Sequence, residues 1–163
     1  MSTVDPAGFT AALQAPRGCF VTLELDGALR GCVGVLVPRR SLVEEVAHAA
    51  HGAACRDPRF PPLGPEAALR ASLQVSVLSA PMDLAFTSEA ELIAQLEPGR
   101  HGVIVRDRGR VGTFLPAVWE RFEDRAEFFR QLKRKAGLAP DHFSATMAVQ
   151  TYTAECFCDA ATA

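Results

Sequence analysis

Two short stretches of this 163-residue chain place reactive side chains close together. Residues 29–34 read LRGCVG, with the guanidinium of Arg30 two positions before the thiol of Cys32. Side chains two apart on a strand share a face. Thiolate is the reactive form of cysteine, and a nearby cation favours it. The stretch therefore predicts a nucleophilic or redox thiol beside Arg30, and the alternative is that Cys32 is a small apolar core residue.

Two glycines flank this thiol. Gly31 and Gly34 would let a ligand, or another segment of backbone, approach the strand closely. We therefore include both in the predicted substrate-binding set, with packing as the alternative reason for their presence.

Residues 57–63, DPRFPPL, supply the second set of candidates. Three prolines restrict φ and remove amide donors, which predicts a rigid extended loop. Arg59 and Arg30 together could bind a carboxylate or a phosphate, with Asp57 orienting either guanidinium. Alternatively, an ion pair pins the loop to the strand. Phe60 could stack on a planar ligand or simply anchor the loop.

His101 is the candidate general base, because histidine titrates near neutral pH. No spacing argument places it near Cys32, and a surface or capping histidine is the alternative. We predict Cys32 and His101 as the catalytic residues.

One helical spacing suits a metal ion. His48, His51 and Cys55 would lie on one helix face, and imidazole and thiolate are zinc ligands. No fourth ligand can be named from the sequence, so we assign no metal. The nucleotide-binding and hydrolase motifs GK[ST], GxGxxG, GxSxG and HExxH do not occur, and we expect no cofactor.

The elements that must position these residues begin with a hairpin. Asp26 and Gly27 accept the positive φ angles of a two-residue turn between β-rich stretches at 19–25 and 28–35. The remaining elements are expected as helices at 41–55, 88–98 and 123–136, and as strands at 73–77, 102–106, 110–115 and 147–157.

This order of elements lacks regular βαβ alternation. It predicts an α+β fold in which a mainly antiparallel sheet is flanked by about three helices. The length suits a single domain, which we place at 18–158 between a short N-terminal segment, 1–17, and a C-terminal tail, 159–163.

Composition narrows the possible partners and compartments. The 17 basic and 19 acidic side chains supply no overall basic field, so we do not expect nucleic acid as a partner. Neither an export signal nor an apolar run long enough to span a bilayer is present, which predicts a cytoplasmic protein without a membrane anchor. The odd number of cysteines, 5, favours reduced thiols.

The LRGCVG string resembles the hallmark LRGCIG of the AMMECR domain family, whose prokaryotic members are called AmmeMemoRadiSam system protein A. The likeness runs from about residue 18 to residue 157. Other matching stretches lie in the same order, at 20–23, 57–63, 75–78, 102, 113–116, 119 and 135–138.

This resemblance implies an α+β fold with a cleft near the LRGCVG hairpin. It also implies a Memo-like protein and a radical SAM enzyme as partners, while it assigns no reaction. Family members commonly carry a longer helical segment before the first strand. In this chain the segment before the first strand is short, which predicts that a partner chain, such as a second copy, covers the N-terminal side.

Two hypotheses of function follow. In the first, the cleft between the hairpin and the DPRFPPL loop binds or acts on a small anionic or planar substrate. In the second, the chain is a non-catalytic adaptor that recognises a protein or RNA through Arg30 and Arg59.

Overall fold

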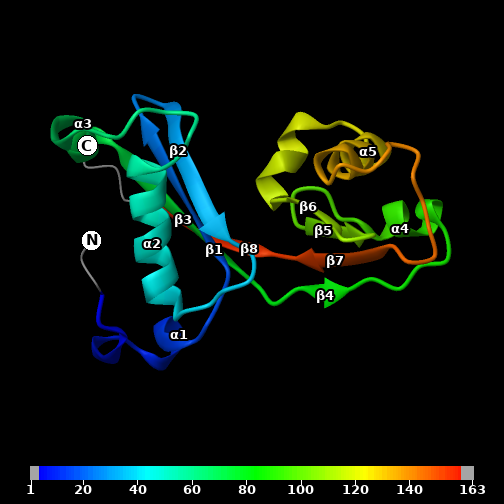
Figure 1. Ribbon diagram of the computed structural model, residues 1–163, viewed down its shortest axis with the longest axis horizontal. Helices are drawn as coiled ribbons and strands as arrows, with labels where there is room; N and C mark the ends of the chain where they lie inside the picture. Colours follow the sequence, from blue (N-terminus) through cyan, green and yellow to red (C-terminus); the bar gives the residue numbers. More distant parts are fainter. Residues whose placement is uncertain (1–3, 159–163) are drawn as a thin grey trace. The chain divides into compact units, whose positions relative to one another are not determined.

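The computed structural model describes residues 4–158, in which the chain forms two compact units (Figure 1). The first unit combines residues 4–79 with residues 155–158, and the second contains residues 80–154. Each unit has a four-stranded sheet, ordered β2-β1-β3-β8 in the first and β4-β7-β5-β6 in the second. The α+β class is confirmed, with the predicted strands shared between two sheets.

The predicted hairpin is the centre of the first unit. Strands β1 (Cys19–Leu25) and β2 (Ala28–Val35) pair antiparallel through a turn in which Asp26 has a φ of 53° and Gly27 a φ of 77°. Strand β3 (Ser72–Leu78) pairs antiparallel with the other side of β1. Strand β2 is therefore an end strand of its sheet.

Helix α2 (Leu42–Cys55) covers one face of this sheet. It begins with the predicted capping box, in which Glu44 N–H donates to the Ser41 side chain and the Glu44 carboxylate accepts from Ser41 N–H. The other helices of this unit are η1 (Pro6–Gly8), α1 (Ala11–Gln14) and α3 (Pro65–Arg70). The core between helix and sheet contains Cys19, Val21, Leu42, Ala49 and Val77.

The second unit encloses an aromatic core. Its elements are β4 (Met82–Asp83), α4 (Glu89–Gln95), β5 (Gly102–Asp107), β6 (Arg110–Phe114), η2 (Pro116–Arg121), α5 (Arg125–Lys135) and β7 (Ala148–Tyr152). The rings of Trp119 and Phe128 stack with centroids 3.5 Å apart and planes inclined by 4°. Phe128 is fully buried and also meets Phe114 edge-on. These rings join η2, α5 and β6 around one core.

The prediction of a single strand at 147–157 is wrong. Strand β7 ends at Tyr152 in the second sheet, and β8 (Ala154–Cys158) begins just after it in the first sheet. The side-chain alternation of the sequence is that of a strand on both sides of Thr153. Side-chain alternation indicates that the backbone is extended, but it does not indicate which sheet the strand belongs to. The predicted tail at 159–163 lies outside the described residues.

Across residues 4–158, every helix is too short or too polar to traverse a lipid bilayer.

We expect Phe128→Ala to lower the free energy of unfolding of the second unit by about 3–5 kcal/mol, because a buried ring is lost from the aromatic core. The control is Val111→Ala, at a side chain that is 52% exposed. This control should change the free energy of unfolding by less than about 0.5 kcal/mol, as surface substitutions usually do. Urea denaturation followed by tryptophan fluorescence measures both, and equal effects would contradict this assignment of the core.

Candidate functional site

The carboxylate of Asp57 joins the DPRFPPL loop to the outer edge of β2. It is almost completely buried, with 3% of the side chain exposed. One oxygen, Oδ2, accepts the backbone N–H of Cys32 at 2.9 Å, and both oxygens accept from the Arg59 guanidinium at 2.6 and 2.9 Å. The Arg59 guanidinium also donates to the Cys32 carbonyl at 3.4 Å. Together the two side chains bind both main-chain polar groups of Cys32.

This arrangement explains two pKa shifts. Hydrogen bonds from the Arg59 guanidinium and then from the Cys32 amide hold the pKa of Asp57 well below its usual range. The hydrogen bond to Asp57 likewise raises the pKa of Arg59. The pair is therefore ionised at neutral pH.

The thiol of Cys32 lies on the sheet face opposite α2. Cys32 stands opposite Thr22 on β1, and the Thr22 hydroxyl donates to Sγ at 3.4 Å. The Cys32 side chain is half-buried, whereas Cys19, on the helix-covered face, is fully buried. Burial raises the pKa of the Cys19 thiol to about 11. Cys32 is thus not a residue of the core beneath α2, and Cys19 is.

Both arginines converge on Phe60. The Cζ atoms of Arg30 and Arg59 each lie 5.5 Å from the centre of the Phe60 ring, within the range of a cation–π interaction. Arg30 also donates through Nη2 to the carbonyl of Pro61. Its Nη1 is buried, and within residues 4–158 it has no hydrogen-bond partner. We call Arg30, Cys32, Arg59 and Phe60 the thiol–arginine surface.

Packing accounts for the two glycines of the motif. A Cβ on Gly31 would come within 2.1 Å of the Ala53 carbonyl oxygen on α2. A Cβ on Gly34 would come within 2.1 Å of the Cys19 carbonyl oxygen and within 2.5 Å of the Phe20 ring, both on β1. Both glycines therefore permit close approach of backbone within the fold, as one of the two sequence interpretations expects.

His101 belongs to the second unit. Its Nδ1 accepts the Glu97 backbone N–H at 3.1 Å, and its carbonyl accepts the indole N–H of Trp119 at 2.7 Å. Its side chain is only 12% exposed. These contacts tie the start of β5 to η2, and the general-base role stays a prediction.

The helical spacing that suited a metal ion does not produce a site. Within residues 4–158, His, Cys, Asp and Glu side chains do not gather in a group of three or more that could hold a metal ion. His48 lies half-buried on α2, and Cys55 is exposed at its end.

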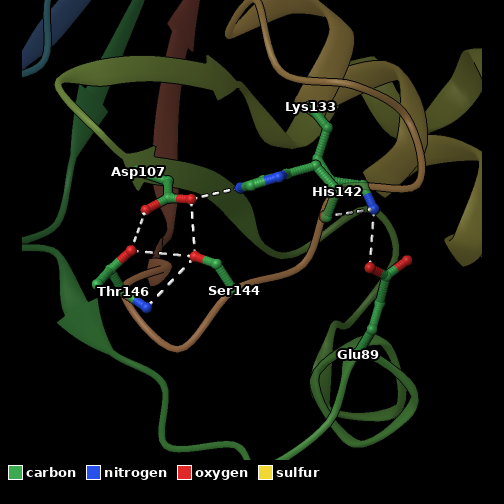
Figure 2. Close-up of polar contacts among 6 residues, drawn as sticks. All are labelled: Glu89, Asp107, Lys133, His142, Ser144 and Thr146. Carbon is green, nitrogen blue, oxygen red and sulfur yellow. Dashed lines mark hydrogen bonds and ion pairs between the residues drawn. The ribbon is translucent and has the colours of Figure 1, made fainter.

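A second polar cluster, in the second unit, was not predicted from the sequence (Figure 2). The buried carboxylate of Asp107, at the end of β5, accepts from Ser144 at 2.8 Å and from Thr146 at 2.6 Å, and it also bonds His142 Nε2. These hydrogen bonds, that of His142 first, lower the pKa of Asp107. In the sequence, Asp107 is recognisable only as a residue of the turn between two strands. Its partners lie 35–39 positions further along the chain, so no local pattern links them to it.

The presence of Asp, His and Ser in this cluster does not make a hydrolase triad. In a triad the imidazole bonds the serine hydroxyl and the carboxylate orients the imidazole. Here Ser144 and His142 both bond Oδ2 of Asp107. The carboxylate thus anchors the loop before β7 to the end of β5.

A buried ammonium group secures the same loop. Lys133 on α5 is fully buried, and its Nζ donates to the Glu89 carboxylate at 2.8 Å and to the His142 carbonyl at 3.2 Å (Figure 2). It also lies 5.2 Å from the centre of the Phe129 ring. The ion pair therefore joins α4, α5 and the loop.

These features define an α+β protein with two antiparallel sheets and a thiol–arginine surface on an edge hairpin. The sequence model of the AMMECR1 family matches residues 2–157, and the chain belongs to this family. A Methanopyrus kandleri relative, Protein MK0488, is 43% identical over 136 residues, which is 81% of this chain and 66% of that protein. Protein MJ0810 of Methanocaldococcus jannaschii is 38% identical over 77% of this chain and 64% of its own length.

A solved structure has the same fold. The crystal structure of the uncharacterized protein PH0010 from Pyrococcus horikoshii matches with a TM-score of 0.82 and 35% identity, covering 91% of this chain and 76% of that one. The chain spans about two thirds of the length of the curated relatives that it matches. These matches establish the family and the fold and assign no reaction.

We expect Asp57→Asn to lower the melting temperature at pH 7, because it weakens the bonds to Arg59 and Cys32. The folded-state pKa of Asp57 is depressed. Its contribution is therefore fully present above the ordinary carboxyl pKa of about 3.9 and is lost as pH falls below that value. The difference between wild type and variant should shrink on acidification, which thermal melts across this pH range measure.

The matched control is Asp26→Asn, at a turn residue whose side chain is 71% exposed and whose φ is 53°. Asparagine also accepts this left-handed conformation. The control should melt close to wild type at every pH. A loss for Asp57→Asn that stayed constant through the acid range would contradict the ionised pair.

We expect Asp107→Asn to destabilise the second unit at neutral pH, with the same sign of pH dependence, because the pKa of Asp107 is also lowered in the folded chain. Hydrogen exchange should show faster opening of residues 142–147. Unchanged exchange there would show that the loop does not depend on this carboxylate.

Proposed function

We propose that the thiol–arginine surface binds a small anionic or planar substrate, and that Cys32 acts on it as a nucleophilic or redox thiol. The observation that carries the proposal is the convergence of two guanidinium groups on the Phe60 ring beside a half-buried thiol outside the core. A cluster of one thiol, two cations and an aromatic ring has the chemistry to hold a carboxylate or phosphate.

Arg30 has binding capacity left for such a group. Its Nη2 is used by Pro61, whereas Nη1 has no protein partner in the described chain. A buried donor without a partner is costly, so an acceptor oxygen would be stabilised at Nη1. Because solvent does not reach Nη1 here, the Arg30 side chain would have to shift for a ligand oxygen to bind it. Arg59 contributes positive charge, although Asp57 holds its orientation.

Cys32 would supply the reactive group. Thr22 donates to its sulfur, and the Arg59 guanidinium reaches its carbonyl, so positive charge and a donor lie near the thiol. Reactive cysteines are found in partly exposed, electropositive surroundings of this kind. A general-base role for His101, and backbone contacts from Gly31 and Gly34 to the substrate, stay predictions.

The proposed setting is the cytoplasm, with a Memo-like protein and a radical SAM enzyme as partners, as the family resemblance implies. The relatives are longer than this chain, so these partners and any activity of the whole protein are part of the proposal.

Self-association through the N-terminal side also stays a prediction. A groove of about 430 Å³ lies there in the first unit. Its lining is mainly apolar and comprises Ala12, Leu13, Arg17, Leu42, Val43, Val46, Val75, Val77, Glu155 and Phe157. Apolar side chains of this kind are suited to burial against a second copy of the chain.

The second candidate function is a non-catalytic adaptor. Its support is that Asp57 and Arg59 satisfy each other and the backbone of Cys32, which is a structural role. On this hypothesis, Arg30→Ala weakens capture of a protein or RNA partner, and Cys32→Ser is tolerated.

Alkylation by iodoacetamide, resolved by peptide mass spectrometry, tests the thiol chemistry. At neutral pH we expect Cys32 to react faster than Cys55, an exposed thiol that serves as the internal reference, while buried Cys19 stays unmodified. Inorganic phosphate should protect Cys32 several-fold without affecting Cys55, and Arg30→Gln should abolish the protection.

Thermal melts of a second variant separate chemistry from packing. Cys32→Ala should leave the melting temperature nearly unchanged if the thiol serves function. A large loss of stability in this variant, or a Cys32 that reacts more slowly than Cys55 and ignores phosphate, would refute the proposed substrate site.

A further inference from the structure

The outer edge of β2 is protected along only part of its length. As an end strand, β2 has main-chain groups that face away from β1. At Cys32 these groups are bound by Asp57 and Arg59. In an antiparallel pair the outward-facing residues alternate, so the N–H and C=O of Gly34 face the same way. Within residues 4–158, Gly34 receives no comparable side-chain bond.

A groove of about 250 Å³ runs beside this open part of the edge, between β2 and α2. One flank of the helix forms its wall through residues spaced three or four apart. The lining residues are Val33, Gly34, Val35, Arg40, Glu45, His48, Ala49, Gly52 and Arg56.

The groove lining carries two arginines, Arg40 and Arg56, against one acidic residue. The Glu44 carboxylate, outside the lining, lies close enough to interact electrostatically with Arg40 and His48, so Arg56 is the main attractive charge. Glu45 is the acidic residue of the lining, and its buried carboxylate already accepts the backbone N–H groups of Arg39 and Arg40 at 2.8 and 3.1 Å. It also lies 3.6 Å from the Arg40 guanidinium. Arg56 has no ion pair within residues 4–158, and His48 also lines the groove.

We propose that an extended acidic segment of a partner protein binds here by adding a strand to β2. Main-chain hydrogen bonds to Gly34 would provide the pairing, as in other cases of strand addition. Val33 points toward α2, where its Cγ1 would lie 2.9 Å from a Cβ placed on Gly52. Residues of the added strand on this same face therefore point into the groove, and carboxylates there meet Arg40, His48 and Arg56.

A feature beyond the end of the strand supports the same partner. Val37, just past β2, is 68% exposed. Natural proteins normally blunt a free sheet edge with charge or cover it, and an exposed valine does neither. The site uses the backbone edge and the helix flank, and it is independent of the thiol–arginine surface.

Fluorescence anisotropy with a fluorescein-labelled heptapeptide of alternating glutamate and valine tests the proposal. We expect saturable binding that Arg56→Glu weakens by about tenfold or more, since it replaces an attractive charge with a repulsive one. Arg121→Glu makes the same charge change at an exposed residue of the second unit and should have little effect. A peptide with lysine in place of glutamate should not bind.

The backbone contribution needs its own control. A peptide of the same sequence with N-methyl groups on alternate residues keeps the charges and loses the pairing, and it should bind at least about tenfold more weakly. In ¹⁵N spectra the Gly34 amide should shift on peptide addition more than the Cys32 amide, which Asp57 already binds.

Several results would overturn the proposal. If the N-methylated peptide bound as tightly as the unmethylated one, the contact would be charge attraction without strand pairing. If Arg121→Glu weakened binding as much as Arg56→Glu, the binding would be nonspecific. Tighter binding of a polyuridylate RNA with the same Arg56 dependence would assign the groove to RNA. Arg30→Gln and Cys32→Ala should leave peptide binding unchanged, so failure of this site and failure of the thiol–arginine surface are distinguishable.

Discussion

The buried carboxylate of Asp57 is the interaction on which the candidate site depends. A charged group in this position is tolerated because donors surround it, two from the guanidinium of Arg59 and one each from the amides of Cys32 and Arg59. Its bonds fix the proline-containing loop against an edge strand, and this brings Phe60 and both arginines to one place. Without it the loop would lose its hydrogen bond to the backbone amide of Cys32.

Because the Asp57 carboxylate holds Arg59 as well as the backbone of Cys32, the two arginines of the site have different roles. Arg59 is committed to Asp57 and to the carbonyl of Cys32, so its first contribution is structural. Arg30 is held less completely, with one nitrogen on Pro61 and, within the described chain, one without a protein partner. If the surface binds an anion, Arg30 is therefore the arginine with a hydrogen-bond donor left for it. Arg59 would contribute its positive charge and would hold the loop in place.

Local patterns predicted much of the fold. The bounds of both hairpin strands and the capping box of α2 follow from Asp26-Gly27 and from Ser41 with Glu44, whose preferences act over a few residues. The division into two sheets did not follow, because alternation continues on both sides of Thr153. The anchoring of Asp107 was also out of reach, since its partners are brought to it only by tertiary structure.

The way the chain passes between sheets bears on its synthesis. The first sheet takes three strands from the part of the chain up to Ser79 and its remaining strand from Ala154–Cys158, whereas the second sheet is drawn from the continuous stretch between them. During translation the second unit can thus assemble while the first still exposes the edge of β3. The unit that emerges earlier from the ribosome is the one completed later.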